Sequence, residues 1–466
     1  MRPPAVAAEA MVATSQPLAT RAGLRVLERG GNAADAALAA AAVLCVAEPM
    51  STGIGGDCFA LVWKDSRADG LDAAGPAPAS ADPDAPVASR GPRSITVPGS
   101  VAGWAALAER YGRLGLDACL TDAIDAAERG VAVAPRTAAA WELLGGPAEL
   151  GQPPCVGQRF RQPELGRTLR AIAEGGPDAF YAGSVGEAIV KASWLEQDDL
   201  ERFAPRWAEP LRLTYRGTEV LELPPPTQGV AALEALGLLE CGEPSLVNQV
   251  ECARLALEDA FAHVRDGADV SGLLEPAYLD RRRLAAAWPV SEPAGGTVYL
   301  CAVDSDRMAV SFIQSLFEGF GSGVVAPGTG VVLQNRGACF AVGGHVEPGR
   351  RPYHTIIPGM LLRDDVLLGP FGVMGGFIQA QAHMQLVSAL VDDRLDPQAA
   401  LDRPRFRVDG ERVLLEQGLW ERTDEIPGAV RSDDSFGFGG GQAILVQSEA
   451  LVGGSDSRKD GYAAGF

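Results

Sequence analysis

The sequence predicts a layered α/β fold, and three stretches of its 466 residues support this prediction. Residues 17–63 read as two helices followed by an apolar strand. Residues 100–290 are mostly helical by their periodicity, with Pro- and Gly-rich interruptions. Beyond residue 297, short apolar runs alternate with glycine turns. Strands and helices mixed along one chain in this way are typical of stacked sheet and helix layers.

The first two helices have recognisable ends. Pro17 lies where the first turn of a helix favours proline, and the glycines at 30–31 end that helix. Asn32 is placed to cap the next helix, with Asp35 three residues later as in a capping box. This second helix is rich in alanine, which suits close packing, and it ends before Pro49.

A glycine-rich loop at 51–57 connects the second helix to an apolar strand at 58–63. Phosphate-binding loops follow a strand and end in Lys with Ser or Thr. The loop in this chain precedes its strand and lacks those residues, so the order of elements does not favour a phosphate site.

The C-terminal part of the chain is predicted to hold several short strands and one long helix. The helix is expected at 377–392, directly after Gly375 and Gly376. The last residues, 453–466, read as a loose polar tail. Strands are expected at 297–303, 308–316, 330–334 and 356–362.

The composition indicates a compact, enzyme-like protein with an acidic surface. Hydrophobic residues make up 47% and charged residues 21% of the chain, and the formal net charge is −20. Such a charge argues against nucleic acid or an anionic membrane as a partner. No apolar run is long enough to span a bilayer, and the first residues lack the apolar core of a signal peptide, so we expect a cytoplasmic protein.

Cysteine and histidine usage predicts neither disulfides nor a metal. The eight cysteines are scattered, form no Cys-x-x-Cys pair and mostly have apolar neighbours, so we expect reduced core thiols. Only four histidines occur, without a metal-binding spacing. We therefore expect no metal and no cofactor.

The residue of greatest chemical interest is Thr297. It follows Gly295 and Gly296 and starts an apolar, strand-like run. A hydroxyl at the start of a strand is ordinary by itself. If the Gly296–Thr297 bond were cut, Thr297 would carry a free α-amine with a pKa near ~8, and this amine can act as the general base for the adjacent hydroxyl.

A series of ordered motifs gives the chain a resemblance to the γ-glutamyltransferase family of N-terminal-nucleophile (Ntn) hydrolases. The match runs nearly end to end, and so many motifs in one order are highly specific. The motifs are 10–20 (AMVATSQPLAT), 30–36 (GGNAADA), 48–56 (EPMSTGIGG), 97–103 (VPGSVAG), 224–229 (PPPTQG), 320–323 (FGSG), 327–330 (PGTG), 351–355 (RPYHT), 374–376 (MGG) and 402–406 (DRPRF).

The resemblance implies a four-layer αββα Ntn-hydrolase sandwich, made as a precursor that cuts itself before a threonine. The matching threonine is Thr297. Cleavage would give a large chain, 1–296, and a small chain, 297–466, which stay together in one domain covering 1–466. The change of pattern near residue 297 is then not a domain boundary.

The resemblance also implies roles for three residues near the nucleophile. The backbone N–H groups of Gly375 and Gly376 would hold the oxyanion. Ser315 aligns with a family threonine that supports the nucleophile. Without the resemblance, the two glycines read as a helix-entry turn and Ser315 as an ordinary strand serine.

The substrate-binding positions depart from the family pattern. The family grips the α-carboxylate of glutamate with an arginine, and the matching position is Ala74, which cannot replace a bidentate guanidinium. The positions that hold the α-amine read Phe317 and Cys339, which make the pocket more apolar. The family's paired serines become His354 and Thr355. The resemblance therefore implies that the catalytic groups are kept while the glutamate-binding pocket is changed.

Two of the pocket positions leave alternatives open. Arg336 could supply a new positive anchor for the substrate, or it could be a surface arginine. His354 could touch the substrate, or it could cap a turn.

Three functions are compatible with these observations. The leading one is a self-processing threonine hydrolase that cleaves an amide or a C–C bond next to a carbonyl in a non-glutamyl small molecule, in specialised biosynthesis such as alkylproline antibiotic pathways. The second is a γ-glutamyl hydrolase or transpeptidase of glutathione-like substrates. The third is an uncut, non-catalytic scaffold. The expected partners are the substrate and the two chains of the protein's own precursor, with a homodimer of processed pairs as a further option.

Overall fold

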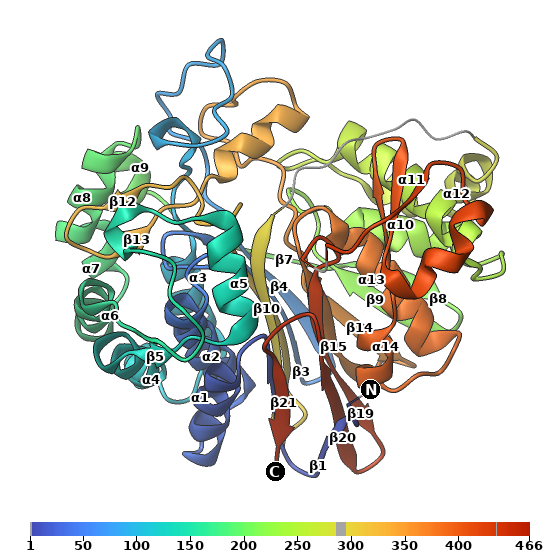
Figure 1. The fold of residues 1–466 in the computed structure, drawn as a ribbon, viewed down its shortest axis with the longest axis horizontal. Coiled ribbons are helices and arrows are strands. Elements are labelled where there is room, and N and C mark those ends of the chain that lie inside the picture. The colour runs from blue at the N-terminus through green and yellow to red at the C-terminus, as the bar shows by residue number, and fades with distance from the viewer. Residues whose placement is uncertain (1, 286–294, 435) are drawn as a thin grey trace.

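Two antiparallel sheets lie face to face and carry helices on their outer sides (Figure 1). The structure is a computed structural model that describes residues 2–285, 295–434 and 436–466. The layers run helix, sheet, sheet, helix, which confirms the predicted αββα sandwich. Both ends of the described chain lie at the same end of the sandwich, where the N–H of Glu9 donates to the carbonyl oxygen of Phe466 at 2.7 Å.

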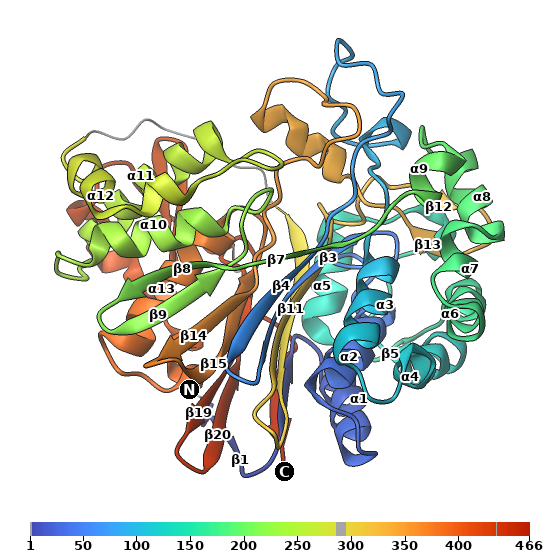
Figure 2. The same cartoon turned by 180° about the vertical axis from the view of Figure 1, so that it is seen from behind.

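Sheet I contains the strand that begins at the predicted cleavage site. All of its seven strands pair antiparallel, and Figure 2 shows its far edge from behind. In spatial order they are β21 (Tyr462–Gly465), β2 (Met11–Thr14), β10 (Gly296–Val303), β11 (Ala309–Phe317), β3 (Asp57–Lys64), β4 (Arg67–Ala73) and β7 (Arg206–Ala208).

Sheet II packs on sheet I and is also antiparallel throughout. In spatial order its strands are β1 (Ala5–Ala7), β20 (Ala450–Ser455), β19 (Gly440–Gln447), β15 (Val366–Met374), β14 (Gly359–Arg363), β9 (Thr218–Glu222) and β8 (Leu211–Tyr215). Short strands outside the two sheets are β5 (Val131–Ala132), β6 (Arg159–Phe160), β12 (Val325–Ala326), β13 (Val331–Val332), β16 (Phe406–Asp409), β17 (Arg412–Leu415) and β18 (Ala429–Arg431).

The helices divide between the two outer layers (Figure 1). On the side of sheet I lie α1 (Pro17–Glu28), α2 (Ala33–Ala47), α3 (Ser100–Tyr111), α4 (Leu116–Arg129), α5 (Pro135–Leu144), α6 (Pro163–Gly175), α7 (Asp178–Tyr181), α8 (Ser184–Ala192) and α9 (Gln197–Glu201). On the side of sheet II lie α10 (Gly229–Leu239), α11 (Leu246–His263), α12 (Pro276–Arg282), α13 (Ile378–Val391) and α14 (Pro397–Asp402).

Alternate side chains of β10 face different layers. Val298 and Leu300 belong to the core between sheet I and its helices, whereas Tyr299 and Cys301 belong to the core between the two sheets. This follows from the two-residue period of a strand. Because both faces of β10 are buried, the strand reads as a continuous apolar run in the sequence.

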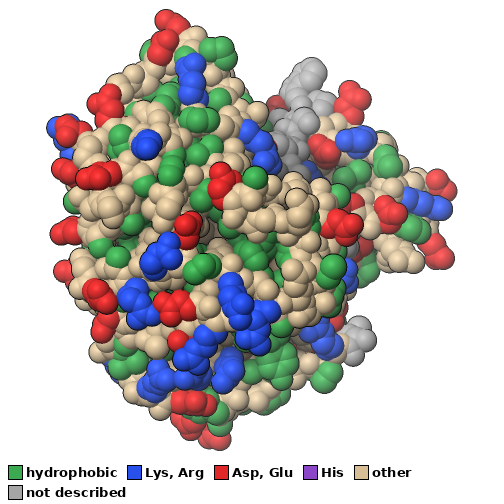
Figure 3. Space-filling model, turned by 60° about the vertical axis from the view of Figure 1, so that its left-hand side comes forward, with side chains coloured by type: hydrophobic (Ala, Val, Ile, Leu, Met, Phe, Trp, Pro, Cys, Tyr) green, Lys and Arg blue, Asp and Glu red, His purple; other side chains and the backbone are tan. Residues whose placement is uncertain are grey.

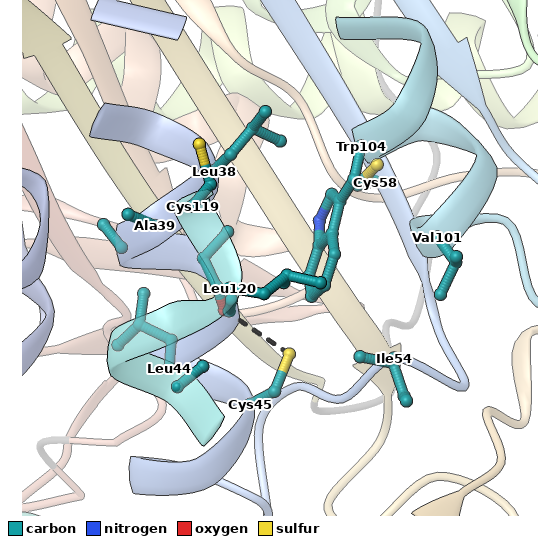
Figure 4. Packing of buried hydrophobic residues seen from close by; sticks show 14 of the residues in the cluster. Leu38, Ala39, Leu44, Cys45, Ile54, Cys58, Val101, Trp104, Cys119 and Leu120 are labelled. Atoms are coloured by element: carbon teal, nitrogen blue, oxygen red, sulfur yellow. Dashed lines mark hydrogen bonds between the residues drawn. The ribbon is translucent and has the colours of Figure 1, made fainter. Parts of the chain in front are cut away.

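Helix α2 forms the centre of the helical layer on sheet I. All of its residues are buried, and Asn32 and Asp35 make the predicted capping box. Figure 4 shows Trp104 of α3 and Leu120 of α4 packed beside it. The thiol of Cys45 donates to a carbonyl of the same helix at 3.4 Å. All eight cysteines are free and six of them are buried, which agrees with reduced core thiols.

Most predicted elements are present, but the C-terminal tail is an error. Helices α1, α2 and α13 and strands β3, β10 and β11 match the predicted ranges. The stretch 453–466, expected as a loose tail, instead contributes to β20 and β21, which lie in different sheets. Strands β7, β8 and β9 also interrupt the mostly helical stretch. These strands are short. β7 and β9 pair with β4 and β14, which are far away in the sequence and which local patterns do not reveal, whereas β8 forms a hairpin with β9.

The surface agrees with the acidic composition. In the face shown in Figure 3, acidic side chains are spread widely, whereas Lys and Arg side chains gather in its lower half. None of the helices in the described ranges combines the length and apolar character needed to cross a membrane. Within those same ranges, no group of three or more His, Cys, Asp or Glu residues is arranged to hold a metal ion.

A close approach between the two sheets leads to a first prediction. A Cβ added at Gly372 of β15 would lie 2.4 Å from a ring atom of Tyr299. Gly372→Ala should therefore lower the free energy of unfolding by about 1–3 kcal/mol, as overpacked cores do. Urea denaturation measures this change. Gly272→Ala is the matched control, since a Cβ there meets no atom within 4 Å. Equal stability of the two variants would contradict the tight contact between the sheets.

Candidate active site

The hydroxyl of Ser315 joins the groups around the Gly296–Thr297 bond. It donates to the carbonyl oxygen of Gly296 at 2.7 Å and accepts the Thr297 hydroxyl at 3.2 Å. It also accepts the backbone N–H of Phe317 at 2.8 Å. Both Thr297 and Ser315 are buried. One serine thus polarises the carbonyl that would be attacked and orients the hydroxyl that would attack it.

The pairing of β10 with β11 is irregular at this bond. Gly296 pairs with Phe317 and Val298 pairs with Gln314, so the register shifts across Thr297. A bulge re-aims a side chain and bends the strand. Here the bulge lies at the candidate nucleophile.

The glycine loop at 51–57 packs against the backbone of Ser315. A Cβ at Gly56 would lie 2.2 Å from the carbonyl oxygen of Ser315, and one at Gly55 would lie 2.2 Å from that of Val332. Only glycine permits such close approach of two backbones. The loop is therefore a packing element beside the candidate nucleophile.

The turn at Gly375 and Gly376 joins β15 to α13 at the same place. Both residues have positive φ, +131° and +75°, which favours glycine. A Cβ added at Gly295 would lie 2.9 Å from the Cα of Gly376. The chain that precedes the Gly296–Thr297 bond thus runs directly against this turn.

Gln228 connects the glycine turn to the predicted pocket. Its Nε2 donates to the carbonyl oxygens of Thr355 at 2.7 Å and of Gly376 at 3.3 Å. Its Oε1 accepts the hydroxyl of Tyr353 at 3.1 Å. Gln228 belongs to the motif at 224–229, but the sequence alone indicates no role for this residue.

A cavity of about 150 Å³ opens beside Thr297. Backbone and apolar side chains form much of its wall, and three charged side chains add to it. These are Arg407, Asp434 and Lys459. None of the three was predicted from the sequence. Two of them stand out in the sequence. Lys459 is one of only three lysines in the chain and lies in a charged stretch with Asp456 and Arg458. Arg407 directly follows the motif at 402–406.

Four of the predicted pocket residues form one buried cluster. The Nη1 of Arg336 donates to the Thr355 hydroxyl at 3.0 Å and contacts the Cys339 sulfur at 3.7 Å. The guanidinium carbon of Arg336 lies 4.5 Å from the ring centroid of Phe317. Arg336 is fully buried, which excludes the alternative of a surface arginine.

His354 and Ala74 lie around Asp57 instead. The Nε2 of His354 is 2.9 Å from Asp57 Oδ2, and its Nδ1 is 2.7 Å from the carbonyl oxygen of Pro352. Asp57 Oδ1 accepts the N–H of Gly75, which follows the buried Ala74. Both ring nitrogens of His354 therefore have partners within the protein.

Glu48 is a buried carboxyl next to the Thr297 cavity. It ends α2 and accepts a hydrogen bond from the Ser15 hydroxyl. Burial raises the pKa of Glu48 to about 7, although the nearby Lys459 opposes the shift. Lys459 lines both the Thr297 cavity and a small hollow beside Glu48.

Fold and site together define a class of protein. A threonine at the start of an inner strand of an αββα sandwich, with a supporting hydroxyl and a glycine turn beside it, is the arrangement of an Ntn hydrolase. The chain belongs to the gamma-glutamyltranspeptidase family, whose sequence profile matches residues 19–466. It is thus an enzyme of the Ntn threonine-hydrolase type.

Individual relatives are similar over almost the whole chain. The chain is 34% identical to a glutathione hydrolase-like proenzyme (YwrD) of Bacillus subtilis, with 98% of both chains covered. It is 32% identical to the oxamate amidohydrolase proenzyme of Klebsiella pneumoniae, with 99% of both covered. The crystal structure of cephalosporin acylase from Bacillus halodurans superposes with a TM-score of 0.93 at 39% identity, covering 100% of this chain and 97% of that one. The two curated relatives are named as proenzymes.

The contacts of Ser315 generate a second prediction. Ser315→Ala removes the donor to the Gly296 carbonyl and should slow self-cleavage by about 100-fold, as loss of one oxyanion donor does. Ser315→Thr keeps the hydroxyl and should cut faster than the alanine variant. Intact mass followed over time after synthesis measures the rate. Ser311→Ala, on the same strand, is the control. Equal rates for the Ser315→Ala and Ser311→Ala variants would contradict this role.

The buried carboxyl generates a third prediction, for stability against pH. The folded-state pKa of Glu48, about 7, lies above the ordinary value of 4.5, so the folded protein holds this proton more tightly than the unfolded chain. The resulting stabilisation is complete below pH 4.5 and is lost as the pH rises through 7. Relative to Glu48→Gln, the wild type should lose about 3 kcal/mol between pH 4.5 and 8. Urea unfolding at several pH values tests this, and parallel curves would contradict it.

Proposed function

We propose that the protein cuts its own Gly296–Thr297 bond and then hydrolyses an amide in a small, non-glutamyl substrate. The observation that carries this proposal is the hydrogen-bonded arrangement of Thr297 Oγ1, Ser315 Oγ and the Gly296 carbonyl oxygen. It supports an attack of the Thr297 hydroxyl on the carbonyl carbon of Gly296, which moves the acyl group from nitrogen to oxygen. Water then hydrolyses the ester, leaving a carboxylate on Gly296 and a free α-amine on Thr297.

The freed α-amine would make Thr297 a nucleophile for other carbonyl compounds. It takes the proton from the Thr297 hydroxyl as that oxygen attacks the substrate. The N–H groups of Gly375 and Gly376 would stabilise the negative oxygen, and the leaving amine would carry away the proton. Hydrolysis of the acyl-enzyme by water restores Thr297. The large chain, 1–296, and the small chain, 297–466, would remain paired in one domain.

The substrate is proposed to lack the glutamate α-amino group. Phe317 and Cys339 stand where the family holds that amine, and neither is an acid or an amide. The names of two relatives, an amidohydrolase and an acylase, support cleavage of a C–N bond. Cleavage of a C–C bond and a role in specialised biosynthesis stay predictions from the sequence.

A fourth prediction tests self-cleavage and substrate class together. The wild type should appear as two chains divided before Thr297 in intact mass spectra, and Thr297→Ala should stay at full length because it lacks the attacking oxygen. Thr329→Ala, a buried threonine elsewhere, should cut as the wild type does. A wild type that stays uncut would instead support the scaffold alternative. Rapid turnover of γ-glutamyl-p-nitroanilide by the cut protein would support the glutathione-type alternative.

A further inference from the structure

Two side chains of α13 hold the backbone where strands β14 and β15 stop pairing. The pairing of β15 with β14 ends at Phe371. Two residues further on, the N–H of Val373 donates to Nε2 of His383 at 3.0 Å. Ile357, which precedes β14, donates its N–H to Oε1 of Gln379 at 3.1 Å. Buried backbone N–H groups need an acceptor, and α13 supplies one for each of these two segments.

The contacts of His383 determine which ring nitrogen carries a proton. Nε2 accepts the N–H of Val373, so it holds no hydrogen. The proton of the neutral ring is then on Nδ1, which donates to Oε1 of Glu222 at 2.6 Å. Both side chains are fully buried. Burial lowers the pKa of His383 and raises the pKa of Glu222, so the hydrogen bond joins a neutral imidazole to a neutral carboxyl group.

The hydrogen bonds of His383 connect three elements of the fold. Glu222 is the last residue of β9, Val373 lies in β15, and α13 carries the imidazole ring. Because β14 lies between β9 and β15 in sheet II, the ring joins two strands that are not neighbours. The centroid of the Phe371 ring lies 4.9 Å from that of the imidazole. The ring is therefore held at both nitrogens and packed beside an aromatic side chain.

The same hydrogen bonds span the glycine turn. Val373 precedes the turn and His383 follows it, so their hydrogen bond ties its two ends together. Met374 and Gly375 line the cavity that also contains Thr297. A shift of β15 against α13 would change the direction of the N–H groups in the turn, and donors at an oxyanion tolerate little misplacement.

We propose that His383, held by Glu222, is a positioning residue that directs the N–H groups of the turn at 375–376 toward the reacting carbonyl oxygen. This inference rests on the proposed function, in which those N–H groups stabilise the oxyanion. The imidazole touches no substrate. It accepts the N–H of Val373 as a neutral ring, and the carboxyl group of Glu222 keeps the ring in the tautomer that can accept.

The first test measures acylation of Thr297 by p-nitrophenyl acetate, a small activated ester. Oγ1 of Thr297 takes the acetyl group and p-nitrophenolate leaves, and intact mass follows the acetyl group on the small chain of the cut protein. His383→Leu removes the acceptor and should lower the acylation rate by about 100-fold, the scale of a misplaced oxyanion donor. His383→Gln places a carbonyl oxygen near the position of Nε2 and should recover most of the rate.

Self-cleavage supplies the measurement that separates positioning from folding. Because Ser315 holds the carbonyl of Gly296, both His383 variants should cut themselves at nearly the wild-type rate. Gln385→Leu is the matched control, since Gln385 lies on the same helix but binds the backbone of Phe406 in β16. It should keep both rates. Wild-type acylation by His383→Leu, or equal slowing of self-cleavage and acylation in it, overturns the inference.

A second pair of variants covers the case in which His383→Leu fails to fold. Glu222→Leu removes the partner of the Nδ1–H group, whereas Glu222→Gln keeps a carbonyl oxygen that can accept from it. The leucine variant should acylate far more slowly than the glutamine variant. Equal acylation rates for the two variants overturn the role of Glu222.

Nuclear magnetic resonance of the wild type tests the tautomer directly. The chain has only four histidines, and His383→Gln identifies the signals of His383 in ¹⁵N-histidine-labelled protein. At neutral pH the ring should be neutral with its proton on Nδ1. A protonated ring or a proton on Nε2 overturns the inference, because neither form accepts the N–H of Val373. A wild type that is never cut, or whose Thr297 is never acylated, overturns the proposed function instead.

Discussion

The packing of the two sheets against each other is the constraint on which the candidate site depends. Thr297 is the second residue of β10 in sheet I, whereas Gly375 follows β15 in sheet II. They meet only because the sheets stack closely, with the Tyr299 ring set against Gly372. A small displacement between the sheets would separate the candidate nucleophile from the glycine turn, and the oxyanion contacts proposed for that turn would tolerate little misplacement.

Within that frame, a single hydroxyl brings the reacting groups together. Ser315 contacts the attacking oxygen, the attacked carbonyl and the N–H of Phe317 at the same time. Through Phe317 the same contacts lead to Arg336. Ser315 and the predicted pocket residue Phe317 are therefore close neighbours in β11, and a change at Phe317 affects both the contact with Ser315 and the stacking with Arg336.

Much of this arrangement could be predicted from the sequence, and the failures have physical causes. The ends of α1 and α2 are set by local interactions, such as the Asn32 capping box, and local patterns reveal them. The strand β21 was missed because its stability comes from pairing with β2, more than 400 residues away. Thr297, Ser315 and the two glycines were predicted from the family resemblance, and the fold brings them close together.

The burial of Arg336 was beyond sequence reasoning. Charged side chains are mostly exposed, so composition alone favours a surface position for any arginine. Its burial depends on Phe317, Cys339 and Thr355, which come from three separate segments of the chain. Likewise, the cavity beside Thr297 gathers Arg407 and Lys459 from the last part of the chain, and only the completed fold shows that they share a wall.

The dependence of the Gly296–Thr297 bond on distant strands has a consequence for biosynthesis. Thr297 reaches Ser315 only in a paired sheet, and the cavity beside it is finished by residues near the end of the chain. If self-cleavage depends on this geometry, a misfolded or incomplete chain is not cut. The α-amine of Thr297 then stays in its peptide bond with Gly296. Activation would thereby act as a folding checkpoint, since a nascent copy could attack no metabolite before its last strand has docked.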